Sequence, residues 1–200
     1  QWDLVNIPQS YKVDSNNLPR KSNGSFIKGD FYDKMNPHTY FAYADNMFSF
    51  SARFGTNTAI GDLLFLHASG TKQSGFGTIK WIELGNEPEG AWNGVHNYYS
   101  AYQLAALTSA AYDGHCRTMT SSVINKGYHL GVKNGDPNMK AAMAGVSAVS
   151  NEYITSMCYW MKANRADGKT AFDAFNVHCY MTKSLTLANG SSVSVGASPE

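Results

Sequence analysis

A chain of 200 residues is long enough to form one domain with a substantial hydrophobic core. Its net charge of +1, with no run of Lys and Arg, argues against a nucleic-acid partner, because phosphate binding needs a basic surface. There is no stretch of about 18 consecutive apolar residues, so we expect no membrane span. Aromatic residues make up 13% of the chain, which suits either core packing or a surface that stacks on ring-shaped ligands.

The first half of the chain alternates long irregular segments with short regular ones. Residues 2–7 predict a strand, and the polar residues 8–35, rich in Gly, Pro and Asn, predict a long loop. Asn36-Pro37 is typical of a helix start, apolar residues follow at spacings of three and four, and Gly55 predicts the helix end. Residues 56–77 predict another irregular connection, with a short helix at 62–68.

The second half predicts three further strands separated by two helices. Strands are expected at 78–84, 139–145 and 174–180. Helices are expected at 97–111 and around an apolar face formed by Ile154, Met157, Cys158 and Met161. Residues 112–138 and 181–200 predict loops. No repeat or linker marks a boundary, so we expect residues 1–200 to belong to one domain.

The order of elements predicts an α/β fold, because the crossovers are long enough for parallel pairing. Runs such as IKWIEL and AFNVHCY are typical of strands covered on both faces. A doubly wound sheet and a (β/α) barrel both fit this order. Polar residues after three successive strands favour the barrel, whose active site lies at the carboxyl ends of its strands: Glu87, Gly145 with Ser147, and His178 with Tyr180.

The cysteines and histidines show no familiar ligand spacing. Cys116, Cys158 and Cys179 are odd in number and lack a CxxC motif, so we expect no disulfide framework, although one pair could meet in space. The spacing of the histidines matches no zinc site. We therefore expect neither a metal nor a cofactor.

The stretch IELGNEPEGAWNG resembles the fourth-strand motif of glycoside hydrolase clan A, which comprises retaining (β/α)8-barrel enzymes. The resemblance implies that Glu87 is the general acid/base and that Asn86 binds the sugar 2-hydroxyl. NVHCY is similar to the sixth-strand motif of the clan, which implies that His178 and Tyr180 line a substrate subsite. Together with FSFSARFG, AYDGH and VKNGDPNMKAAMAG, these segments look like a subgroup from polysaccharide-degrading bacteria.

One departure from the clan is large. Its nucleophile is a second glutamate after the seventh strand, and Glu200, the one late glutamate here, follows Ser-Pro with no strand before it. The four expected strands look like the third to sixth of a barrel. The chain is thus expected to form about half of a barrel, with the nucleophile and the remaining strands outside it. The start, QWDLVNIPQ, shows no export signal, so a secreted, periplasmic or cell-surface location is implied by the resemblance alone.

Several residues near Glu87 have competing interpretations. Glu83 lies four residues earlier on the same strand face, deeper in the core, where it would need a cationic partner, and Glu89 is expected to be solvated in the turn. Trp81 and Trp92 are candidates for dry walls that would keep Glu87 protonated, and Trp92 also for sugar stacking. His115 is as consistent with a loop held by an Asx-turn as with substrate contact. Glu87 itself has the simpler interpretation of a turn carboxylate that caps the next helix.

Two other functions remain open. The missing nucleophile and the many Tyr and Trp residues also suit a carbohydrate-binding protein without activity. An unrelated α/β domain, in which Asn-Glu-Pro is coincidental, would have an open sheet without a groove at Glu87. The polysaccharide, and whether it is cleaved internally or from its ends, do not follow from these residues.

Overall fold

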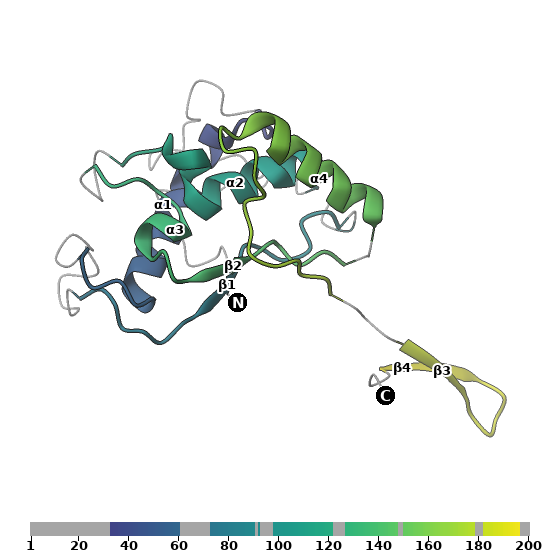
Figure 1. Ribbon diagram of the computed structural model, residues 1–200. Coiled ribbons are helices and arrows are strands. Elements are labelled where there is room, and N and C mark those ends of the chain that lie inside the picture. Colours follow the sequence, from purple (N-terminus) through teal and green to yellow (C-terminus); the bar gives the residue numbers. More distant parts are fainter. Residues whose placement is uncertain are drawn as a thin grey trace, which may run out of the picture.

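The computed structural model describes residues 33–60, 73–90, 92, 98–121, 127–147, 150–178 and 182–196. The expected strand at 2–7, the helix at 62–68 and most of the loop at 8–35 lie outside these residues. Within them the chain is a mixed α/β structure, in which helices cover one side of a small parallel sheet (Figure 1).

The first helix begins where the sequence predicts. Asn36 caps a short 3-10 helix, Pro37–Tyr40, by accepting a hydrogen bond from the His38 N–H, and helix α1, Phe41–Phe54, continues from it. The Gly55 N–H donates to the Ser51 carbonyl at 2.8 Å and closes the last turn. The apolar face of α1 contributes buried residues to the core, among them Ala44, Phe48 and Ala52.

Helix α2, Ala101–Arg117, starts four residues later than expected. A capping box fixes its start: the Ser100 hydroxyl accepts from the Gln103 N–H, and the Gln103 side chain accepts from the Ser100 N–H. Such a cap contributes about 1 kcal/mol. The helical conformation ends before Asp113, and residues 114–117 form a left-handed turn with φ between 51° and 67°.

Two more helices complete the helical layer. Helix α4, Asn151–Asn164, begins at Ser150, whose hydroxyl accepts from the Tyr153 N–H at 3.2 Å, and packs against α2. The short helix α3, Val132–Gly135, lies within the segment expected to be a loop and packs against α1 and α2. The sequence gives α3 no apolar period because the helix has a single turn.

Three segments of the chain run parallel, in sequence order. Strands β1, Trp81–Glu83, and β2, Lys140–Ala142, pair with Ile82 opposite Ala141. A third segment, residues 173–178, pairs with the other edge of β2 through the bridges Ala142–Ala174 and Val146–Val177. The parallel order is the one expected, but the regular strands are shorter and the third segment forms isolated bridges.

The sheet is covered on one face by the described residues. Ile82 and Leu84 point into a buried cluster with residues of α1 and α3, whereas their neighbours Trp81 and Glu83 are exposed on the other face. Phe175 on the third segment is also exposed. The expectation of cover on both faces is therefore not met within the described residues. Residues 81–84 alternate between exposed and buried, whereas Lys80 before them is exposed as well.

Residues after the third segment form a hairpin, where a loop was expected. Strands β3, Thr182–Thr186, and β4, Ser192–Gly196, pair antiparallel and project away from the helical layer (Figure 1). Asn189-Gly190, with φ +82° at the glycine, lies in the turn. Asn-Gly between alternating residues is a strong hairpin signal, and the prediction of a loop was wrong because this signal was overlooked.

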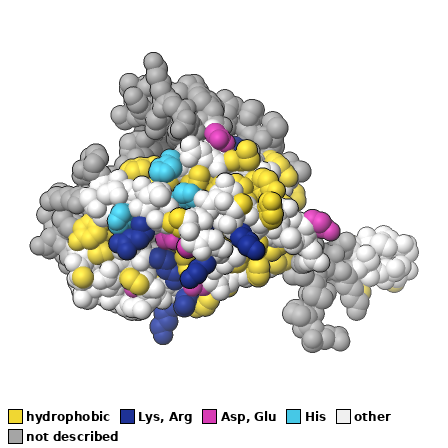
Figure 2. All heavy atoms as spheres, turned by 45° about the horizontal axis from the view of Figure 1, so that its top comes forward, with side chains coloured by type: hydrophobic (Ala, Val, Ile, Leu, Met, Phe, Trp, Pro, Cys, Tyr) yellow, Lys and Arg dark blue, Asp and Glu magenta, His cyan; other side chains and the backbone are white. Residues whose placement is uncertain are grey.

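The surface agrees with the balanced charge of the sequence. Figure 2 shows that the basic side chains on the helical side of the molecule lie among acidic ones instead of forming a separate basic patch. No helix within the described residues is long and apolar enough to span a membrane.

Candidate functional site

The carboxyl ends of the three parallel segments meet at one edge of the sheet. Asn86 pairs with Gly145, and Val146 pairs with Val177. The His178 N–H then donates to the Val146 carbonyl at 2.8 Å. These pairings bring together Glu87, Gly145 and His178, which come from three distant parts of the sequence.

Glu87 is held in an uncommon backbone conformation. Its φ of 46° lies in the left-handed region, which few residues other than glycine adopt and which is often found at functional sites. Its N–H donates to the Gly145 carbonyl at 2.7 Å, and its carbonyl accepts from Gly90 at 3.0 Å. The residue is 8% exposed. The fold thus fixes a carboxyl group in a nearly dry position just beyond a strand.

The imidazole of His178 lies between two carboxylates. Its Nδ1 is 2.9 Å from Glu87 Oε1, and its Nε2 is 3.2 Å from Glu83 Oε1. The hydrogen bond with Glu87 raises the pKa of His178, partial burial opposes this, and the charge of Glu83 adds to the rise. The sheet edge therefore carries a hydrogen-bonded set of two carboxyl groups and a histidine that favours protonation.

Gly145 provides the space in which this set assembles. The Glu83 Oε1 atom accepts from the Gly145 N–H at 2.9 Å, and a Cβ at Gly145 would lie 2.6 Å from that oxygen and overlap His178 Nε2. The φ of Gly145 is not in the left-handed region, so glycine is needed here for room and not for conformation.

Glu89 differs from its predicted solvated position. Its Oε1 accepts hydrogen bonds from the backbone N–H and from the hydroxyl of Ser147, the latter at 2.7 Å. Glu89 therefore ties the turn after β1 to the end of the second parallel segment. Glu83 also differs from expectation, because its side chain lies on the open face of the sheet, 35% exposed, with His178 as its partner.

The remaining predicted site residues lie in three different situations. Asn86 is exposed and contributes its backbone to the pairing with Gly145. Trp92 is 66% exposed, and its indole lies against Gly90, next to the turn that carries Glu87. Tyr180 lies outside the described residues. Of the predicted residues, the structure thus brings Glu87 and His178 into contact.

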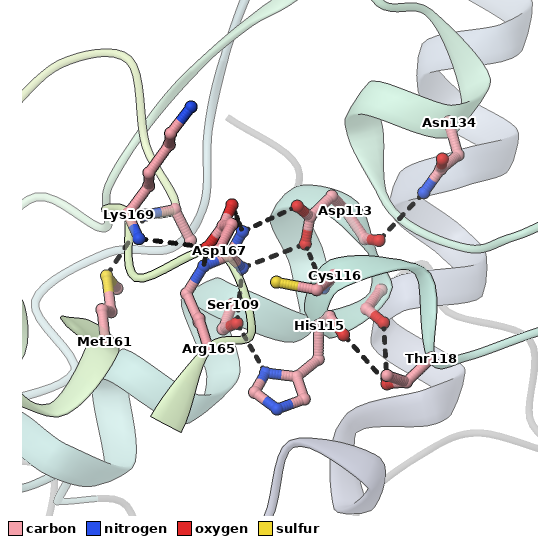
Figure 3. Close-up of polar contacts among 12 residues, drawn as sticks. Ser109, Asp113, His115, Cys116, Thr118, Asn134, Met161, Arg165, Asp167 and Lys169 are labelled. Carbon is pink, nitrogen blue, oxygen red and sulfur yellow. Dashed lines mark hydrogen bonds and ion pairs between the residues drawn. The ribbon is translucent and has the colours of Figure 1, made fainter. Parts of the chain in front are cut away.

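His115 belongs to a separate cluster, shown in Figure 3. Its Nδ1 lies 2.9 Å from the Ser109 hydroxyl, and burial lowers its pKa, as does the charge of Arg165. It follows the helical part of α2, which starts beyond the carboxyl end of β1 and returns toward the opposite end of the sheet. The structure therefore does not bring His115 to Glu87. The Asp113 carboxylate accepts from the Cys116 N–H at 2.9 Å and so holds the turn locally, at a spacing of three residues where an Asx-turn has two.

Arg165 is the centre of that cluster. Its buried guanidinium donates to both carboxylate oxygens of Asp113, at 3.0 and 2.8 Å, to Asp167 and to the Ser109 hydroxyl. Burial works against ionisation of Asp167, but the hydrogen bonds from Arg165, the Lys169 N–H and Cys116, together with the charge of Arg165, outweigh it and lower the pKa to about 2.

One set of possible metal ligands is present in the described part of the chain. Donor atoms of Asp113, Cys116 and Asp167 lie within 4.8 Å of one another. The guanidinium of Arg165, bound to both carboxylates, already supplies the positive charge there. This group is consequently an ion-pair network that joins the end of α2 to the segment after α4. Cys116 and Cys158 are free thiols, and Cys179 lies outside the described residues.

Sequence reasoning predicted Glu87 and His178 as site residues, and the structure places them in contact, but it did not predict the contact of Glu83 with His178. The available signal was the spacing of four, which places Glu83 and Glu87 on the same side of a strand.

Comparison of the chain with protein-family models, with curated proteins and with solved structures finds no significant match.

Proposed function

We propose that this chain is the central part of a retaining glycoside hydrolase that acts on a polysaccharide, with Glu87 as the general acid/base. The observation that carries the proposal is the buried Glu87 carboxyl group, held beyond a parallel strand and hydrogen-bonded to His178. Polysaccharide cleavage needs a carboxylic acid that protonates the departing oxygen, and burial favours the protonated form. The resemblance of the surrounding motif to clan A supports the same role.

In this proposal the three parallel segments are strands four to six of a (β/α)8 barrel. Their parallel order and the polar residues at their carboxyl ends support that assignment. The open face, with Trp81 and Glu83, would be the barrel interior. The nucleophile would come from the seventh strand, outside this chain, because retention of configuration needs a second carboxylate about 5–5.5 Å from the first. A secreted or cell-surface location follows from the size of the substrate.

The test is the substitution Glu87→Gln in the enzyme that contains the remaining strands. Loss of the general acid should lower turnover of a polysaccharide by about 10²–10⁴-fold and leave binding largely unchanged. With a substrate whose leaving group needs no protonation, the rate of the first step, cleavage of the glycosidic bond, should fall far less. The matched control is Glu152→Gln, at an exposed position of α4, which removes the same charge elsewhere. Hydrolysis of the polysaccharide at the wild-type rate by Glu87→Gln would rule out the assignment.

A second candidate function is carbohydrate binding without catalysis. The exposed indoles of Trp81 and Trp92, 55% and 66% exposed, favour it because a Trp face stacks well on a sugar ring. Quenching of Trp fluorescence by an oligosaccharide, with no reducing ends released by the enzyme that includes all strands, would establish binding alone. Release of reducing ends would favour the hydrolase.

A further inference from the structure

Both nitrogens of the His178 imidazole face a carboxylate oxygen. Nδ1 is 2.9 Å from Glu87 Oε1, and Nε2 is 3.2 Å from Glu83 Oε1. Each of these two hydrogen bonds needs a proton between its nitrogen and its oxygen, whereas a neutral imidazole has a single N–H. The three side chains together must therefore hold two protons.

Two arrangements satisfy this requirement with Glu83 ionised. In one, a doubly protonated His178 lies between two carboxylates. In the other, neutral His178 donates from Nε2 to Glu83 and accepts at Nδ1 from a protonated Glu87. Both arrangements have the same total charge and differ only in which atom holds the proton between Nδ1 and Glu87 Oε1.

The alternative, a proton on Glu83, is disfavoured by the surroundings. Glu83 Oε1 already accepts the Gly145 N–H at 2.9 Å, so this oxygen is the acceptor in two contacts, and the Glu83 side chain is 35% exposed. The Glu87 side chain is 11% exposed, so burial favours its neutral form. The second proton therefore belongs to the His178–Glu87 pair.

We propose that Glu83 is a positioning residue, which binds the Nε2–H of His178 and so directs the second imidazole proton to the Nδ1 side, where Glu87 shares it. Its purpose rests on the proposed function, because this shared proton is the one that Glu87 gives to the departing oxygen. After that transfer Glu87 is a carboxylate that faces the lone pair of Nδ1. This repulsion favours recovery of a proton from the water that completes hydrolysis.

Glu83 and Glu87 are charged groups of the described residues that act on the imidazole. The experiment follows the ring nitrogens of His178 by NMR in the ¹⁵N-labelled chain, from about pH 5 to about pH 9, across the range in which histidine titrates. His178→Asn identifies the signals. Glu83→Gln keeps the shape and a hydrogen-bond acceptor but removes the charge. It should lower the titration midpoint of His178 by about one pH unit, the usual effect of one nearby charge.

Glu152→Gln is the control for loss of a charge, and it should leave the midpoint unchanged. An unchanged midpoint in a folded Glu83→Gln variant would overturn the proposal. If that variant does not fold, the wild-type spectrum decides. A proton on Nε2 near neutral pH supports the proposal, whether or not Nδ1 also carries one, and an Nε2 without a proton contradicts it.

The NMR titration does not depend on hydrolase activity, so this proposal and the proposed function can fail independently of each other. A His178 that responds to Glu83→Gln in a protein without hydrolase activity would refute the function and retain the positioning role. A hydrolase in which His178 ignores Glu83→Gln would refute the positioning role and retain the function.

Discussion

At the scale of single residues, the arrangement of Glu83, Glu87 and His178 depends on Gly145, which has no side chain. Gly145→Ala places a methyl group where the Glu83 carboxylate and the His178 ring now lie. We expect the variant to be destabilised by about 1–3 kcal/mol, as overpacking typically is, and to lose the contact between His178 and Glu83. Urea unfolding measures the first effect, and the NMR titration of His178 measures the second.

A second glycine distinguishes crowding from a general intolerance of alanine. Gly190→Ala lies in the hairpin turn, where no atom would contact the added methyl group, so its cost comes from φ alone and His178 should titrate as before. If His178 in Gly145→Ala also titrates as in the wild type, the ring does not occupy the position described here.

At the scale of elements, the Arg165 cluster joins the end of α2 to the segment after α4, and its strength should depend on pH. The pKa of Asp167 is about 2, below its ordinary value of 3.8, so Asp167 stabilises the fold above that ordinary value and this contribution disappears as the pH falls toward 2. Asp167→Asn should therefore cost up to about 1 kcal/mol near neutral pH, since the carboxylate is 39% exposed. Thermal unfolding from pH 7 to pH 2 should show the two proteins converge.

Arg165→Met provides the contrast within the same cluster. It leaves the carboxylate of Asp113 without its buried partner, so we expect a loss of about 3–5 kcal/mol. Equal losses for Asp167→Asn and Arg165→Met near neutral pH would contradict the assignment of Arg165 as the buried centre.

The elements also show what sequence reasoning can reach. Helices α1 and α4 were predicted from local signals: Asn36-Pro37, apolar spacing and Gly55 for α1, and apolar spacing alone for α4. Two other elements have local signals that the prediction did not use: the capping box of Ser100 and Gln103 at the start of α2, and Asn189-Gly190 in the β3–β4 hairpin. The ion pair between Arg165 and Asp113 and the contact between Glu83 and His178 join residues more than 50 positions apart. The spacing of Glu83 and Glu87 places both on one side of a strand, but no local pattern identifies a partner at such a distance.

At the scale of the whole molecule, the lengths of the crossovers predict the parallel order of the strands. They do not predict that one face of the sheet is open. Burial is set by what packs against a strand, and Trp81 is apolar enough to suggest a buried position. The result is a sheet whose alternate residues have opposite environments: Leu84 is 1% exposed and Trp81 is 55% exposed. This difference leads to a prediction about the two faces.

Leu84→Ala should cost about 2–5 kcal/mol, because it opens a cavity between the sheet and the helices, whereas Trp81→Ala should change the free energy of unfolding by less than about 1 kcal/mol. Urea unfolding of both variants in the 200-residue chain measures the difference. If the open face is the interior of a barrel, the ranking should change when the remaining strands are present, since Trp81 would then be buried as well. A large cost of Trp81→Ala in the 200-residue chain alone would mean that residues of this chain already cover that face.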